Sequence, residues 1–332
     1  MSDVYRVFGA EVSPYSVKVR SYLRYKGIPH EWIVRGAPTQ EEFQKYAKLP
    51  LVPLVVTPDD VGIQDSTPII ETLEARFPDP PLQPEDADLA FLSALLEEFG
   101  DEWGNKWMFH YRWAREVDRS SAAGRIARTM MPGLSDEQYA GMSRQIEERM
   151  VNRVWFVGSS EQTAPRIEAS FEEGVALLEA HLATRPYLFG ARPALADFGI
   201  WGQLYNAWTD PTAGDILKAR ASRVVAWIER MLDPKAEGDF EDWPRLAATL
   251  EPLLAQQVGR LFLPWSAANA LAIAAGDETF SVELDGCTWS QKPQKYHARS
   301  LAEIRRKYAA LANTSGLDPI LERTGCLEFL RG

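Results

Sequence analysis

The stretch SPYSVKVRSYLRYKGIP, residues 13–29, decides the fold. It follows a short strand-like run at residues 4–8, and Pro14 opens a helical pattern that Gly27 ends. A helix N-terminus carries free N–H groups and a partial positive charge, which stabilise a thiolate held there. Ser13, just before Pro14, therefore predicts a hydroxyl that faces a bound thiol. The same residues also fit an ordinary serine N-cap without a ligand.

A second serine lies one turn further into this helix, at position 16. Two serines cannot form a disulfide or attack one, which disfavours a thiol–disulfide oxidoreductase. Ser16 is expected to bond the helix backbone with its hydroxyl.

Two later segments carry further signals. The run LVPL at residues 51–54 places a proline at the start of a strand, which suits a cis bond. Such a bend leaves the preceding backbone groups unpaired and able to receive an extended peptide. The run QDST at residues 64–67 predicts a helix start with Ser66 as N-cap beside Asp65. That pair offers acceptors for an ammonium group and N–H donors for a carboxylate. A plain edge-strand proline and a plain N-cap are the alternatives.

The order of these elements predicts a two-domain chain with an addition. Residues 1–80 follow a βαβ, α, ββα order, an α/β pattern, and a proline-rich linker occupies residues 78–85. Residues 87–234 are predicted to be all-helical. Residues 235–332 are expected to hold a hairpin around Asp285-Gly286, and helices. The helical periods fall at residues 89–107, 137–154, 164–182, 197–208 and 223–231.

Composition narrows the class of protein. The chain has 332 residues and a formal net charge of −11, which argues against a nucleic-acid partner. Its two cysteines cannot form a disulfide framework, and its four histidines show no metal-ligand spacing. We find no signal-peptide pattern and no apolar run long enough to cross a membrane. We therefore expect a soluble, cytoplasmic protein without a metal or a membrane partner.

Taken together, the three segments resemble the cytosolic glutathione transferases over roughly residues 4–232. The runs RVVAWIERM at residues 223–231 and LADF at residues 195–198 add to the match. The first stretch is most similar to serine-type members such as the plant tau class. The resemblance implies a thioredoxin-like N-terminal domain, a helical-bundle C-terminal domain, and a long extension beyond the family's usual end.

The resemblance also implies a glutathione site. Ser13 would activate the thiol, Val52 would pair with the cysteinyl backbone, and Asp65 and Ser66 would hold the γ-glutamyl end. Leu51 stands where the family often has a lysine for the glycyl carboxylate, and Lys48 is the expected replacement. The implied glutathione-binding set is Lys48, Val52, Pro53 (as the cis-proline), Gln64, Asp65 and Ser66.

The resemblance implies that the helix at residues 99–111 borders the pocket for the electrophilic substrate, and Tyr15 is a further expected residue of that pocket. Trp107 and Tyr111 are the expected contacts on that helix. Their helical spacing fits core packing better than a pocket. In the family's buried helix, Ala194 replaces the usual Ser or Thr cap, whereas Asp197 keeps the acidic position.

These features predict an enzyme that directs the glutathione thiolate at an apolar electrophile, by conjugation or exchange. The alternative is a non-catalytic binding or interaction protein on the same scaffold. A homodimer is expected, because the family pairs the first domain of one subunit with the helices of the other and the linker leaves both faces exposed. Residues 235–332 are expected to pack against the helical domain and narrow the entrance to the site.

Overall fold

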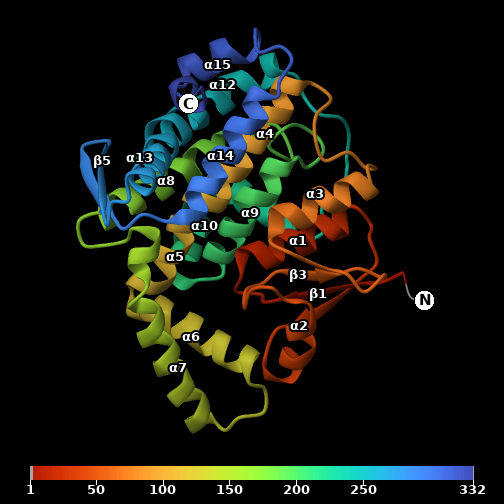
Figure 1. Ribbon diagram of the computed structural model, residues 1–332, viewed down its shortest axis with the longest axis vertical. Helices are drawn as coiled ribbons and strands as arrows, with labels where there is room; N and C mark the ends of the chain where they lie inside the picture. The colour runs from red at the N-terminus through yellow and green to blue at the C-terminus, as the bar shows by residue number, and fades with distance from the viewer. Residues whose placement is uncertain (1–2, 332) are drawn as a thin grey trace.

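The computed structural model describes residues 3–331, which form a small sheet domain beside a larger helical body (Figure 1). The sheet has strand order β2-β1-β3-β4, with β1 and β2 parallel and the other pairs antiparallel. This arrangement confirms the predicted thioredoxin-like domain. Its elements are β1 (Tyr5–Gly9), α1 (Pro14–Tyr25), β2 (His30–Val34), η1 (Ala37–Thr39), α2 (Gln40–Tyr46), β3 (Leu54–Val56), β4 (Gly62–Gln64) and α3 (Ser66–Arg76).

The strand register brings the three predicted segments to one edge of the sheet. Phe8 lies opposite Leu54, and Leu54 lies opposite Gln64. The chain leaves β1 toward Ser13, enters β3 from Pro53 and leaves β4 into Asp65. Neighbouring strands are about 4.8 Å apart, so the three segments converge over a distance that one small peptide can span.

The helical domain confirms the expected all-helical region and adds two helices that the periodicity did not identify. These are α6 (Glu116–Met130), whose sequence is polar and carries an interior glycine, and α10 (Pro211–Arg220). Helices α6 and α7 project from the lower end of the molecule (Figure 1). The other elements are α4 (Ala87–Phe99), the π-helical turn η2 (Gly100–Gly104), α5 (Asn105–Ala114), α7 (Asp136–Val151), η3 (Val154–Val157), α8 (Ala164–His181), α9 (Leu195–Trp208) and α11 (Ser222–Arg230).

Helix α9 is the buried helix of this domain and packs directly on α1. Gly202 permits the close approach, since a Cβ there would lie 2.7 Å from the Pro14 carbonyl oxygen. Although Ala194 cannot cap the helix, the Asp197 carboxylate accepts the Ala194 amide, at 2.9 Å. It also accepts the indole N–H of Trp227 at 2.9 Å. The missing cap is thus offset by a buried carboxylate that ties α9 to its neighbours.

The residues after α11 form a compact addition rather than a tail. They comprise a continuous helical segment, a β-hairpin and three more helices. The hairpin turn has positive φ at Asp285 (53°) and Gly286 (76°), as a type I′ turn requires. The elements are α12 (Trp243–Leu253), the π-helical η4 (Leu254–Phe262), α13 (Leu263–Ala275), β5 (Phe280–Leu284), β6 (Cys287–Gln291), α14 (Lys295–Ala309), α15 (Leu317–Arg323) and α16 (Leu327–Leu330).

One helical segment in the described chain is long and apolar enough to cross a membrane by length and composition alone. It is Trp243–Ala275, and half of its most apolar window is buried inside the protein. From the sequence we expected no such segment. Burial of this kind is also what a core helix shows, and Leu246, Leu250 and Leu253 are fully enclosed.

Helix α14 lies across both domains. On its sheet-domain side, Lys307 forms an ion pair with Glu71 of α3 at 3.0 Å. On its helical-domain side, Ser300 donates a hydrogen bond to Glu98, and the Tyr308 ring packs edge-on against Phe91 of α4. In Figure 1 it runs alongside α4. Helix α14 therefore covers part of α4, whereas α3 keeps exposed residues such as Thr72.

A buried ion cluster joins the first domain to the second. Lys18 of α1 is fully buried, and its Nζ lies 2.5 Å from Glu97 Oε1 and 2.6 Å from Asp101 Oδ2. Thr67 of α3 donates a further hydrogen bond to Glu97 at 2.8 Å. Burial, with the like charge of Glu97, raises the pKa of Asp101 to about 7 against the opposing pull of Lys18. Two desolvated carboxylates thus depend on one lysine for compensation.

Lys18→Met should therefore destabilise the fold strongly. We expect the free energy of unfolding at pH 8 to fall by about 3–5 kcal/mol, because two buried carboxylates lose their counter-charge. The loss should be smaller at pH 5, where Asp101, whose pKa is raised to about 7 in the folded state, can take up a proton. Urea denaturation at both pH values measures it. The control is Lys218→Met, which removes an exposed lysine with no ion pair among residues 3–331. Equal losses in the two variants would contradict the prediction.

Candidate functional site

Ser13 stands at the N-terminus of α1, where the sequence predicted it. It is the N-cap, and its Oγ accepts the Ser16 amide at 3.3 Å. The loop that carries it is held by the helical domain, since Arg112 of α5 donates to the Val12 carbonyl at 2.8 Å. Asp210 in turn orients Arg112 at 2.7 Å. The Ser13 hydroxyl is therefore half-buried and fixed beside the first free N–H groups of the helix.

The two residues after Pro14 face the interior. Ser16 is fully buried, and its Oγ has no hydrogen-bond partner in the described part of the chain. The expected bond from Ser16 to the helix backbone is therefore absent. Tyr15 donates its hydroxyl to the Asp101 carbonyl of η2 at 2.9 Å. Burial raises the pKa of Tyr15 well above its ordinary value. Tyr15 thus anchors α1 to the helical domain.

The bend before β3 offers a free stretch of backbone. The Val52–Pro53 peptide bond is cis. Within residues 3–331, neither the amide nor the carbonyl of Val52 has a hydrogen-bond partner. An extended peptide could use both groups, as a strand added to a sheet edge does.

The loop beside this bend is held by Gln64. The Gln64 carboxamide donates to the carbonyls of Leu49 and Leu51, each at 2.7 Å. It accepts the amides of Lys48 and Leu49, each at 3.0 Å. Gln64 therefore uses its side chain to position the loop rather than to face a ligand. Lys48 is exposed and forms no ion pair in the described chain.

The N-cap of α3 lies one residue earlier than predicted. Asp65 is the N-cap of α3, and Ser66, predicted as the cap, is the first helical residue. Asp65 has φ of 83°, an uncommon backbone conformation for a residue with a Cβ. Its side chain makes no capping bond to α3. The carboxylate instead accepts a hydrogen bond from Tyr296 of α14, at 3.2 and 3.4 Å.

Trp107 and Tyr111 lie in the core of the helical domain, each 1% exposed. The Trp107 indole donates to Ser170 at 2.9 Å, and the Tyr111 ring packs against Phe171. Neither side chain offers a surface to a ligand in this arrangement. Periodic aromatic spacing alone could not separate a core from a pocket.

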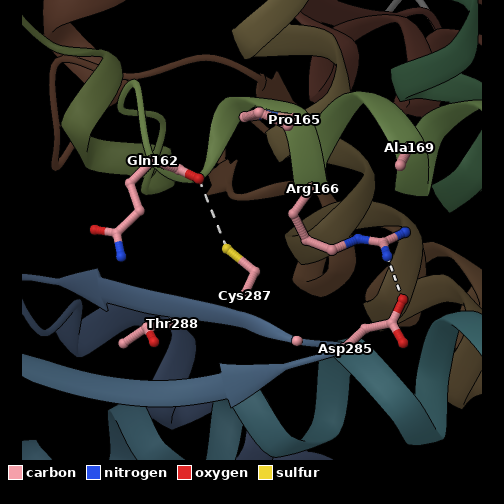
Figure 2. A pocket seen from close by; sticks show the side chains of 8 residues that line it. Gln162, Pro165, Arg166, Ala169, Asp285, Cys287 and Thr288 are labelled. Atoms are coloured by element: carbon pink, nitrogen blue, oxygen red, sulfur yellow. Dashed lines mark hydrogen bonds and ion pairs between the residues drawn. The ribbon is translucent and has the colours of Figure 1, made fainter.

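A separate hollow of about 500 Å³ lies between the start of α8 and the turn of the β5–β6 hairpin (Figure 2). The Cys287 thiol faces the Gln162 carbonyl there, at 3.7 Å, and Arg166 pairs with Asp285. None of the predicted site residues lines it. Among the described residues, no group of three or more His, Cys, Asp or Glu could hold a metal ion.

Two family models match the chain. The one described as glutathione S-transferase, N-terminal domain, matches residues 7–81. The one described as glutathione S-transferase, C-terminal domain, matches residues 161–230. The chain belongs to the glutathione S-transferase family. Residues 82–160 and 231–332 lie outside both matches, and they include the α6–α7 projection and the C-terminal addition.

Curated relatives match over the first domain. Glutathione S-transferase Z2 of Arabidopsis thaliana is 37% identical over 73 residues, which cover 21% of this chain and 32% of that protein. A glutathione S-transferase of Triticum aestivum is 32% identical over 80 residues, covering 24% of this chain and 37% of that protein. The chain therefore spans about a third of the length of these relatives.

Solved structures of similar proteins cover more of the chain. A glutathione S-transferase of Methylobacterium radiotolerans, in complex with glutathione sulfonate, is 19% identical with a TM-score of 0.42, covering 74% of this chain and 94% of its own. The β-etherase LigF of Sphingobium sp. strain SYK-6 is 19% identical with a TM-score of 0.45, covering 74% of this chain and 98% of its own.

The role of Gln64 in holding its neighbouring loop can be tested by amide exchange. We expect Gln64→Ala to speed hydrogen exchange at the Lys48 and Leu49 amides by at least about fivefold, because each loses its acceptor. NMR detection of these two amides measures the change. The control is Gln44→Ala, which removes an exposed glutamine of α2 with no side-chain hydrogen bond in residues 3–331. Unchanged exchange in Gln64→Ala would show that the loop is held by other contacts.

Proposed function

We propose that this protein is a glutathione transferase in which Ser13 holds the thiol of glutathione as a thiolate. The observation that carries the proposal is the convergence of Ser13, the unpaired Val52 backbone and the start of α3 at one sheet edge. The cysteinyl part of glutathione would pair with Val52, and the γ-glutamyl end would reach Asp65 and Ser66. Lys48 is the cation proposed for the glycyl carboxylate.

The change in the pKa of the thiol that Ser13 has to support is modest. A free thiol with a pKa near 8.5 is only a few per cent ionised at pH 7, and a shift of about two units would ionise most of it. That shift corresponds to ~2.7 kcal/mol, within the reach of a helix N-terminus and one charge-assisted hydrogen bond. The thiolate sulfur then attacks an electrophilic carbon of an apolar compound. The new S–C bond forms as the leaving group departs with its electron pair, and the thiol proton has already passed to solvent.

A second candidate is a glutathione-binding or interaction protein without turnover. Tyr296 favours it, because this residue already bonds the Asp65 carboxylate proposed for the γ-glutamyl end. The absence of a lysine at Leu51 points the same way. Binding of glutathione without turnover of a chloro-aromatic acceptor would select this candidate.

A cytoplasmic location stays a prediction.

Ser13→Ala should lower kcat/KM by at least about tenfold, ~1.4 kcal/mol, mainly by raising the pKa of the bound thiol. The pH profile of kcat/KM should therefore move to higher pH, whereas glutathione affinity should change less. Ser16→Ala is the matched comparison and should have the smaller effect, because it removes an unpartnered buried hydroxyl. Circular dichroism checks folding. A wild-type profile in Ser13→Ala, with loss in Ser16→Ala or Tyr15→Phe, would show that another hydroxyl activates the thiol.

The homodimer also stays a prediction. Helix α14 packs on α4 and reaches α3 through the Lys307–Glu71 ion pair, so the surface in these contacts is not open to a partner subunit. Sedimentation at micromolar concentration should show a species of twice the 37.4 kDa chain mass. A single species of 37.4 kDa would overturn the prediction.

A further inference from the structure

We propose that Tyr296 of α14 is a specificity-determining residue of the glutathione site, which competes with the α-amino group of the ligand for the Asp65 carboxylate. The inference rests on the proposed function and deepens it. It assigns to the C-terminal addition a single side chain that tunes which ligands bind and how tightly. The ligand class is a γ-glutamyl peptide with a free α-ammonium group.

The Tyr296 hydroxyl occupies the position that a ligand ammonium group would take on the Asp65 carboxylate. Its Oη lies 3.2 Å from one Asp65 oxygen and 3.4 Å from the other. A donor nearly equidistant from both oxygens occupies the place that a bidentate cation takes on a carboxylate. Among residues 3–331, Asp65 has no ion pair, and its carboxylate accepts no hydrogen bond from any other residue. The Asp65 carboxylate therefore accepts a long hydrogen bond from a single neutral donor, the Tyr296 hydroxyl.

The surroundings favour an arriving cation over the phenol. The Asp101 and Glu98 carboxylates lie near the Tyr296 hydroxyl, and loss of water around it, with the charge of Asp65, raises the pKa of Tyr296. The phenol therefore stays neutral in the working pH range. The buried Lys18 ammonium is already bonded to the Glu97 and Asp101 carboxylates. Hydrogen bonds from a charged donor are about twice as strong as neutral ones, so a ligand ammonium displaces the hydroxyl.

The helix that carries Tyr296 is fixed, whereas the side chain itself can move. His297 contacts Glu102 and packs edge-on against Trp265, and Ser300 is bonded to Glu98. These contacts hold the first turns of α14 to the helical domain and to α13. Tyr296 is 52% exposed, so its ring can rotate outward without opening the core. Ligand entry at Asp65 then needs a side-chain rotation and no unfolding of the addition.

The test is calorimetric titration of glutathione into Tyr296→Phe. Removing only the hydroxyl oxygen should lower the Kd of glutathione by about threefold to tenfold, the range of one lost hydrogen bond. Glutathione with an acylated α-amino group should show no such gain, since it has no ammonium to place on Asp65. In an Asp65→Asn background the gain for glutathione should disappear as well.

The matched control is Tyr308→Phe, which removes the same atom from the same helix. The Tyr308 hydroxyl donates to Asp318 at 2.6 Å, away from Asp65, so the Kd should stay at the wild-type value. An unchanged or higher Kd in Tyr296→Phe would overturn the inference and leave the proposed function standing. A gain of equal size for the acylated ligand would overturn it too. Absence of glutathione binding in both the wild type and Tyr296→Phe would overturn the proposed function and this inference together.

Discussion

The ion cluster of Lys18, Glu97 and Asp101 is the interaction on which the rest of the structure depends. It lies wholly inside the protein, where a lysine without carboxylates, or carboxylates without the lysine, would be strongly unfavourable. The π-helical turn η2 inserts its extra residue at this point. Asp101 thereby turns its carboxylate to Lys18 and its carbonyl to Tyr15. The N-terminus of α1 is consequently fixed against the second domain before any ligand arrives.

Each of the two loops that form the candidate site is held in place by a polar side chain from another part of the chain. Arg112 holds the loop before Ser13, and Gln64 holds the loop before the cis-proline. Gln64 bonds backbone groups, and Arg112 bonds both the Val12 carbonyl and the Asp210 carboxylate, so the loops are positioned without a ligand. Such preorganisation leaves three sets of free groups at the sheet edge: the Ser13 hydroxyl, the Val52 backbone and the start of α3.

The C-terminal addition changes the surroundings of this edge. By lying against both α3 and α4, α14 brings Tyr296 to a carboxylate that would otherwise face solvent. The neighbourhood is acidic, with Asp65 and Asp101 close together, in keeping with the net charge of −11 for the whole chain. The negative electrostatic potential of this neighbourhood favours a ligand ammonium group. A ligand carboxylate would instead depend on the free N–H groups at a helix start.

The sequence by itself determined the features that depend on neighbours along the chain. Pro14 after Ser13 predicts the helix start, the proline at 53 predicts the bend, and Asp285-Gly286 predicts the hairpin turn, because backbone preferences act over a few residues. Tertiary structure alone decided which side chains meet. Tyr296 bonds Asp65 across 231 positions, and the burial of Trp107 in the core follows from how α5 packs on α8. Helical periodicity indicates that one face is covered, but not by what, since the covering surface comes from segments far away in the chain.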